Sequence, residues 1–261
     1  MLDVFFDKWW RVGGVAGILF LVLFIGGYVI QGEGPYFDEP VDEIRDWFTD
    51  NGEQYLVGDY LIGLAFVVFF IPFLSSLRGL LAAAEGRAAV WSRVAFAGGL
   101  LVMIFGATAS LFWGALAYSF GVVENGDEGT IRTLMYLDYY AWSGVPLAFI
   151  PLTLGSSLVI LRTGVLWRWL ALIGLVAAVV GAIGGLGSLL DSDPEGTLSL
   201  IGGISFPLVS LWVLLVSINM ILKREAPAPA PRPPRGSASP WACASTPPGA
   251  SPPPAPAPRS R

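Results

Sequence analysis

Long runs of apolar residues alternate with short polar connections along the chain as far as residue 222. The runs cover roughly 12–30, 60–77, 94–120, 133–161, 165–190 and 198–222. A helix needs about 20 apolar residues to cross the hydrocarbon core of a bilayer, with a range of about 17–25. Every run is long enough, and the first carries no charge at all, whereas core helices of soluble proteins show polar stripes. The pattern predicts an all-α, polytopic membrane protein with six transmembrane helices in residues 1–225.

The connections between these runs alternate in charge. One side holds most of the basic residues, namely Lys8, Arg11, Arg78, Arg87, Arg93, Arg162, Arg168, Lys223 and Arg224. The other side holds only Arg45 and Arg132 and is rich in Asp and Glu. Because positive loop charge is retained in the cytoplasm, we expect both termini to be cytoplasmic.

Residues 31–55 form the only sizeable connection on the acidic side. Within it, the segment from Pro40 to Asp50 has the spacing of a short amphipathic helix, with Val41, Ile44, Trp47 and Phe48 on its apolar face. Asn51 and Gly52 indicate that this helix ends there. One interpretation places this helix flat on the membrane interface. The other makes it a lid over a cavity between the spans.

Residues 226–261 differ in composition from everything before them. They hold thirteen prolines, four arginines and no acidic residue. Such a segment has too few apolar side chains to form a core, so we expect a disordered cytoplasmic tail with local polyproline II structure.

The three spans that run outward begin with similar residues, at Trp9–Gly14, Trp91–Ala95 and Trp167–Leu170. Asp59 precedes Pro72 by the same interval that separates Asp138 from Pro151. One hypothesis is a fold of three repeated helical hairpins. The alternative is convergence, because Trp and Arg favour cytoplasmic interfaces.

Asp59 and Asp138 are the acids that lie closest to the predicted membrane region. Each would fall in the first turn of its span, where a carboxylate interacts favourably with the helix dipole. Interfacial capping is one interpretation, and an ion or proton site is the other. Arg132, two turns before Asp138, is a candidate partner for its carboxylate.

Prolines and glycines suggest two further roles within the spans. Pro72, Pro151 and Pro207 each remove a helix hydrogen bond and are candidate hinges, although such prolines also simply bend helices to pack. The pairs Gly13 with Gly17 and Gly181 with Gly185 fit the small-xxx-small pattern of close helix packing. The pattern leaves open whether the partner helix belongs to the same chain, to a second copy in a homo-oligomer or to another membrane protein.

The composition excludes several chemistries. The chain has no His and one Cys, Cys243, so Cys/His metal sites and imidazole-dependent catalysis are excluded. Its two lysines, Lys8 and Lys223, lie at the edges of the apolar region. We therefore expect no catalytic residues, metal or cofactor. Nucleic acid is not an expected partner, because no basic folded domain is present to neutralise phosphates.

Several short motifs resemble those of a family of uncharacterised, domain-of-unknown-function bacterial integral membrane proteins. They are Trp10–Gly17, Trp47–Phe48, Gly58–Leu61, Trp91–Val94, Leu166–Leu170 and Leu211–Leu214. The resemblance covers about 1–222 and implies a six-helix protein of the bacterial plasma membrane, without supplying an activity. Two functions remain open. The first is a non-enzymatic structural or regulatory membrane component, and the second is a small secondary transporter or channel-like protein with an outward-facing acidic entrance.

Overall fold

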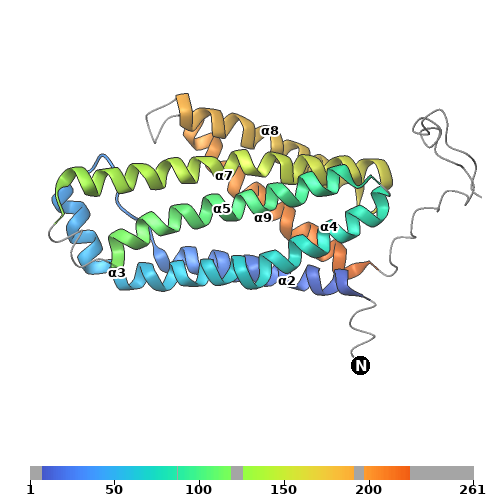
Figure 1. The fold of residues 1–261 in the computed structure, drawn as a ribbon, viewed down its shortest axis with the longest axis horizontal. Helices are drawn as coiled ribbons and strands as arrows, with labels where there is room; N and C mark the ends of the chain where they lie inside the picture. The colour runs from blue at the N-terminus through green and yellow to red at the C-terminus, as the bar shows by residue number, and fades with distance from the viewer. Residues whose placement is uncertain (1–7, 87, 119–125, 191–196, 224–261) are drawn as a thin grey trace, which may run out of the picture. The chain divides into compact units, whose positions relative to one another are not determined.

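Every regular element in the described part of the chain is a helix (Figure 1). The computed structural model describes residues 8–86, 88–118, 126–190 and 197–223. The elements are α2 (Trp9–Gln31), α3 (Val41–Leu64), the π-helical segment η1 (Ala65–Phe70), α4 (Ile71–Glu85), α5 (Val90–Tyr118), α7 (Glu128–Thr163), α8 (Arg168–Leu190) and α9 (Thr197–Leu222). Within these residues, six helices are long and apolar enough to cross a membrane, which confirms the predicted class. The predicted disordered tail at 226–261 lies outside the described residues.

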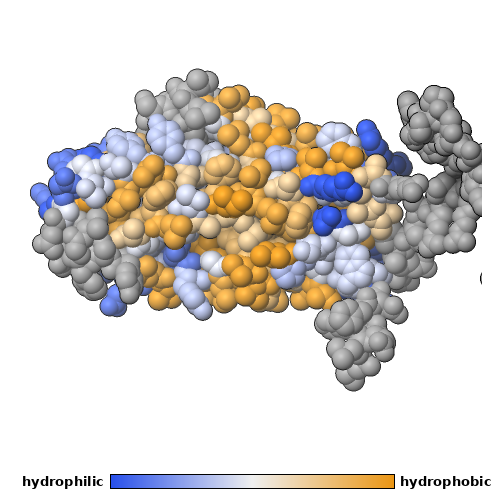
Figure 2. Space-filling model, in the orientation of Figure 1, coloured by the Kyte–Doolittle hydropathy of each residue, from blue (hydrophilic) through white to orange (hydrophobic). Residues whose placement is uncertain are grey.

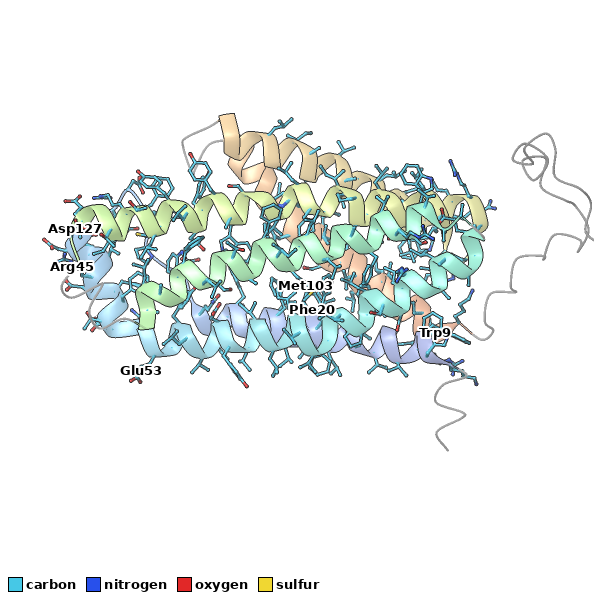
Figure 3. The ribbon with its side chains drawn as sticks, viewed as in Figure 1. Trp9, Phe20, Arg45, Glu53, Met103 and Asp127 are labelled. Atoms are coloured by element: carbon cyan, nitrogen blue, oxygen red, sulfur yellow. The ribbon has the colours of Figure 1, made fainter. Side chains whose placement is uncertain are left out.

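α3, η1 and α4 form one continuous span, and consecutive spans run in opposite directions, so the bundle has two ends (Figure 1). We call the end with the α2–α3 connection and the start of α7 the acidic end. The basic end holds Trp9, the turns after α4 and α7, and Lys223; Figure 3 shows Arg45 and Asp127 at the first end and Trp9 at the second. Helix α2 packs against α3, η1, α4 and α9, helix α5 packs against α7, and α8 packs against α7 and α9.

A hydrophobic surface covers the middle of the bundle, between more hydrophilic ends (Figure 2). It includes large side chains that are mostly exposed, such as Val22 at 61%, Val67 at 63% and Leu111 at 72%. A water-soluble monomer rarely exposes so large an apolar area. The surface is consistent with contact with a lipid bilayer, as expected of a multi-pass membrane protein.

The helix predicted from Pro40 to Asp50 is longer than its sequence suggests. It begins at Val41, but it continues through Asn51 and Gly52 and runs on as η1 and α4. The Asn51 side chain donates to the Trp47 carbonyl one turn earlier, at 3.0 Å, so it does not end the helix. The predicted stop is therefore wrong.

The apolar face of this first part of α3 packs against the protein. Ile44 and Phe48 are buried in a cluster with Leu116 of α5 and with Ile131 and Met135 of α7. The Arg45 Nη2 donates to the Gly126 carbonyl at 2.7 Å, next to the start of α7. The interpretation as a helix lying on the membrane interface is wrong, because its apolar side chains cover the ends of α5 and α7 instead.

The π-helical turn η1 lies directly before Pro72. Proline lacks an N–H, and its ring clashes with the carbonyl four residues earlier in a regular α-helix. The wider π turn, in which the Ile71 N–H donates to the Phe66 carbonyl, accommodates this proline. Helices α7 and α9 instead remain α-helical through Pro151 and Pro207. The proposed hinges and the hairpin repeat both stay predictions.

The two glycine pairs pack against other helices of the same chain. A Cβ on Gly13 would overlap Ser76 of α4, and one on Gly17 would overlap Ser217 of α9 and approach the Phe73 ring to 2.7 Å. A Cβ on Gly181 would lie 2.6 Å from the Pro146 carbonyl oxygen, and one on Gly185 would overlap Leu147, both in α7. These glycines therefore bring helices of the same chain together.

Candidate functional site

The two acids singled out in the sequence come together at the acidic end. Asp59 lies on α3 and Asp138 on α7, close enough for their charges to interact. Tyr55, one turn before Asp59, interacts with both charges. Its ring stacks on that of Trp113 from α5, with ring centroids 5.1 Å apart. Three helices therefore build one acidic and aromatic cluster.

Neither acid caps a helix. Helix α3 begins at Val41 and α7 at Glu128, so Asp59 and Asp138 lie several turns inside. At about 1.5 Å per residue, Asp138 is about 15 Å from the start of its helix, beyond the reach of the helix N-terminal charge. The interfacial-capping interpretation is wrong, because the polar segments that precede both spans are themselves helical.

Each carboxyl group has one neighbour that can donate a hydrogen bond and one unused acceptor. The Trp113 indole lies within hydrogen-bonding reach of Asp138, and the Ser110 hydroxyl within reach of Asp59. The Oδ1 atoms of both residues are buried and have no hydrogen-bond partner among the described residues. Asp138 is only 7% exposed. Buried polar atoms without a partner are costly and rare, so these atoms point to a functional site.

Arg132 does not pair with Asp138. Its Nε donates to Glu128 at 2.8 Å, and its Nη1 donates to the Phe37 carbonyl. The predicted partnership is therefore wrong: Glu128, one turn earlier, is the nearer carboxylate on the same face of the helix. Arg132 instead ties the α2–α3 connection to α7.

A cavity of about 650 Å³ lies beside this cluster, between the α2–α3 connection, α5, α7 and α9. Among the described residues that line it, the charged ones are Glu33, Glu39 and Asp138, all acidic. Seven aromatic side chains contribute to its walls: Tyr28, Tyr36, Phe37, Trp113, Tyr139, Trp142 and Phe206. Asp59 is not among the residues that line the cavity.

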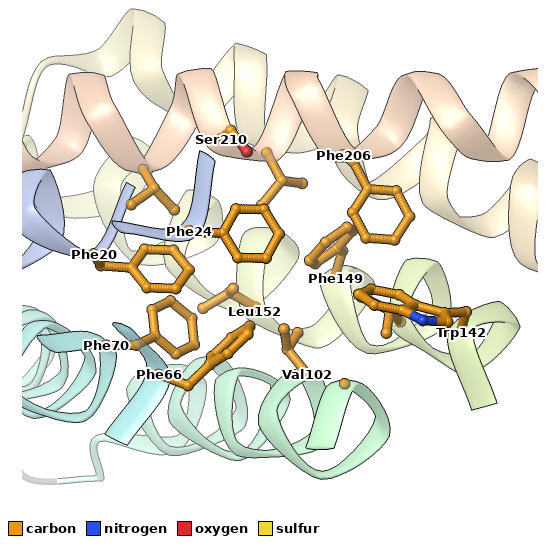
Figure 4. Close-up of a pocket in the computed structure, with 14 residues that line it drawn as sticks. Phe20, Phe24, Phe66, Phe70, Val102, Trp142, Phe149, Leu152, Phe206 and Ser210 are labelled. Carbon is orange, nitrogen blue, oxygen red and sulfur yellow. The ribbon is translucent and has the colours of Figure 1, made fainter. Parts of the chain in front are cut away.

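A second, smaller cavity of about 30 Å³ lies in the bundle centre (Figure 4). Six of its fourteen lining residues are phenylalanines, from α2, η1, α7 and α9, and Ser210 contributes the hydroxyl that Figure 4 shows on α9. Trp142 and Phe206 line both cavities, with their ring centroids 5.7 Å apart. This aromatic pair separates the large cavity from the bundle centre.

The sequence contains little that marks Tyr55, Ser110 or Trp113 as site residues. They lie in or beside apolar runs, where aromatic and hydroxyl side chains are common in any membrane helix. The hint available was the helical spacing that places Tyr55 and Asp59 on one face of α3. Their role depends on which helices pack against each other. The spacing of residues along the chain does not specify this packing.

The Arg132 contacts lead to a local prediction. We expect Arg132→Ala to raise the amide hydrogen exchange of residues 32–40 by at least tenfold, because that segment loses its bond between the Phe37 carbonyl and α7. Glu128→Gln is the matched control, since it removes the ion pair and leaves the bond to Phe37 in place. Equal exchange in parent and Arg132→Ala would contradict this role.

Comparison of the chain with family models, curated proteins and solved structures finds no match.

Proposed function

We propose that this chain is a bacterial plasma-membrane protein that binds an organic cation in the acidic-end cavity, as a small secondary transporter with an outward-facing entrance. The observation that carries the proposal is the chemistry of the cavity wall. Seven aromatic rings and three carboxylates surround about 650 Å³, and no basic side chain is among the described residues of the wall. Aromatic faces attract cations, and a desolvated carboxylate adds a full opposite charge.

The size of the cavity supports a small organic molecule. Pockets for drug-sized ligands occupy about 300–1,000 Å³ and combine apolar walls with a few placed polar groups. A bare metal ion would leave most of this cavity unfilled and would favour oxygen ligands over aromatic rings. An aliphatic or aromatic ammonium group fits both the walls and the charge.

The charge asymmetry supports the proposed orientation. The basic residues gather at the end that holds Trp9 and Lys223, and the positive-inside rule therefore supports a cytoplasmic position for this end. The cavity then faces outward. The motifs that resemble the uncharacterised bacterial family support placement in a bacterial plasma membrane.

The closed bundle centre favours binding followed by a conformational change over an open channel. Trp142 and Phe206 close the floor of the cavity, and the central space beneath holds about one water molecule. Transport requires these rings to separate. The π-helical turn η1, and the positions in α7 and α9 where proline removes a helix hydrogen bond, are the points at which these helices can bend. If the rings never separate, the same site serves a structural or regulatory component that senses the cation.

Tryptophan fluorescence of the purified chain tests the proposal, since Trp113 and Trp142 line the cavity. We expect benzyltrimethylammonium to change the emission in a saturable way and to raise Tm. Its uncharged carbon isostere, neopentylbenzene, should do neither at the same concentration. Equal binding of both compounds, or binding of neither, would overturn the proposal of a cation site. Uptake of the cation into proteoliposomes then separates a transporter from a sensor.

A further inference from the structure

The basic end carries a third cavity, of about 500 Å³, whose charge is opposite to that of the acidic-end cavity. It lies between the α7–α8 turn and the end of α9, lined by Gly164–Arg168 together with Asn219, Leu222 and Lys223. Among the described residues that line it, the two charged side chains, Arg168 and Lys223, are both basic. It is far along the bundle from the acidic-end cavity and does not depend on the function proposed for that site.

We propose that this cavity binds the phosphate of an anionic phospholipid headgroup. Four groups converge there. The Arg168 side chain is exposed and forms no hydrogen bond or ion pair with the described residues. The Lys223 ammonium lies on the same wall and donates to the Val165 carbonyl at 2.9 Å, with two of its three donors left over. The first N–H groups of α8 and the side-chain amide of Asn219 complete the set.

The side-chain amide of Asn219 is the third group on the cavity wall. It is only 6% exposed as a residue, and its side-chain amide forms no hydrogen bond with the described residues. The amide is not one of the fully buried polar atoms that lack a partner, so what remains accessible of it opens into the cavity that Asn219 lines. A largely buried polar side chain normally has a hydrogen-bond partner, so an amide that opens into a cavity is placed to bond a ligand there. Its place on the cavity wall gives the amide a partner once a phosphate is present.

The start of α8 adds to this attraction. The first N–H groups of a helix have no acceptor within the helix and favour an anion. Gly164 adopts φ 65° at the end of α7, and a Cβ there would lie 3.8 Å from the Arg168 Nε. Burial lowers the pKa of Lys223, and a bound phosphate would favour its charged form.

The surroundings favour a lipid as the source of the phosphate. Trp167 and Trp169 are exposed beside the cavity, stacked with ring centroids 5.7 Å apart. Exposed tryptophans are typical of the headgroup level of a bilayer. Basic pockets between transmembrane helices bind anionic headgroups in the same way. The paired charges of Arg168 and Lys223 match a lipid with net negative charge better than a zwitterion.

Native mass spectrometry of the full chain tests this site. Delipidated protein in mild detergent is mixed with phosphatidylglycerol or with phosphatidylcholine of the same acyl chains. We expect retention of one phosphatidylglycerol with at least tenfold preference, and at least tenfold weaker retention by Arg168→Gln. Arg93→Gln is the matched control, because it removes the same charge at the same end, outside the cavity, and should retain the lipid as the parent does.

Asn219→Leu separates lipid binding from folding. We expect weaker lipid retention with Tm in delipidated detergent unchanged or raised, because the amide has no partner within the described protein. A lower Tm for this variant would assign Asn219 a structural role and contradict its part in the site. Equal retention of the two lipids, equal loss in Arg93→Gln, or full displacement by millimolar inorganic phosphate would each overturn the anionic-lipid site.

Discussion

Asp138→Asn is expected to weaken binding of benzyltrimethylammonium at least tenfold. Asp138 is the most buried acid on the cavity wall, and asparagine keeps its shape while removing its charge. Two opposite charges at about 4 Å interact by about 4 kcal/mol at an effective dielectric constant of 20. Each 1.4 kcal/mol is a factor of ten in affinity, so even a third of this energy gives the expected loss.

Two further variants make this result specific. Asp59→Asn should cause a smaller loss, because Asp59 does not line the cavity and acts through its charge on Asp138. Glu53→Gln, an exposed position on α3, should bind the cation as the parent does (Figure 3). We expect Tm of Asp138→Asn to stay equal to that of the parent or to rise, since a buried carboxyl group is replaced by a neutral one. Unchanged affinity in Asp138→Asn would remove Asp138 from the binding site.

The helices themselves could be predicted from the sequence because the membrane imposes one rule on every span. Each run must supply about 20 apolar residues, whatever it packs against, and the six runs meet this condition independently. The start of the amphipathic helix at Val41 could also be predicted, because Pro40 and the acids of the first turn favour a helix N-terminus. Its end was not, because Asn51 and Gly52 stop helices only when nothing continues the packing beyond them.

The site could be predicted only in part. The sequence drew attention to Asp59 and Asp138 as acids near the membrane, but it placed both at helix ends. Their convergence depends on α5 lying between α3 and α7, so that Trp113 meets Tyr55 and Asp138. Helix neighbours are chosen by side-chain packing across the whole bundle, which no local pattern encodes. The π turn before Pro72 could not be predicted either, because a proline in a membrane helix permits a kink, a π turn or neither.

Gly17→Ala is expected to lower the free energy of unfolding by about 1–3 kcal/mol, the usual cost of forcing an extra methyl group into a packed interior. The new Cβ would overlap the Ser217 hydroxyl of α9 and lie 2.7 Å from the Phe73 ring of α4. Denaturant titration of the detergent-purified protein measures this loss. Gly26→Ala is the matched control on the same helix, because no atom lies within 4 Å of its added Cβ. It should be neutral or stabilising, as alanine is the better helix former.

A double-mutant cycle distinguishes packing within the chain from packing between copies. Ser217→Ala removes the hydroxyl that the new methyl group meets, and the Ser217 Oγ has no hydrogen-bond partner among the described residues to lose. The double variant should therefore recover part of the stability lost in Gly17→Ala, giving a coupling energy of about 0.5–3 kcal/mol. If the Gly13–Gly17 face instead joined two copies of the chain, Gly17→Ala would change the oligomeric state and Ser217→Ala would not restore it. Such a result would contradict the intrachain contact of α2 with α9.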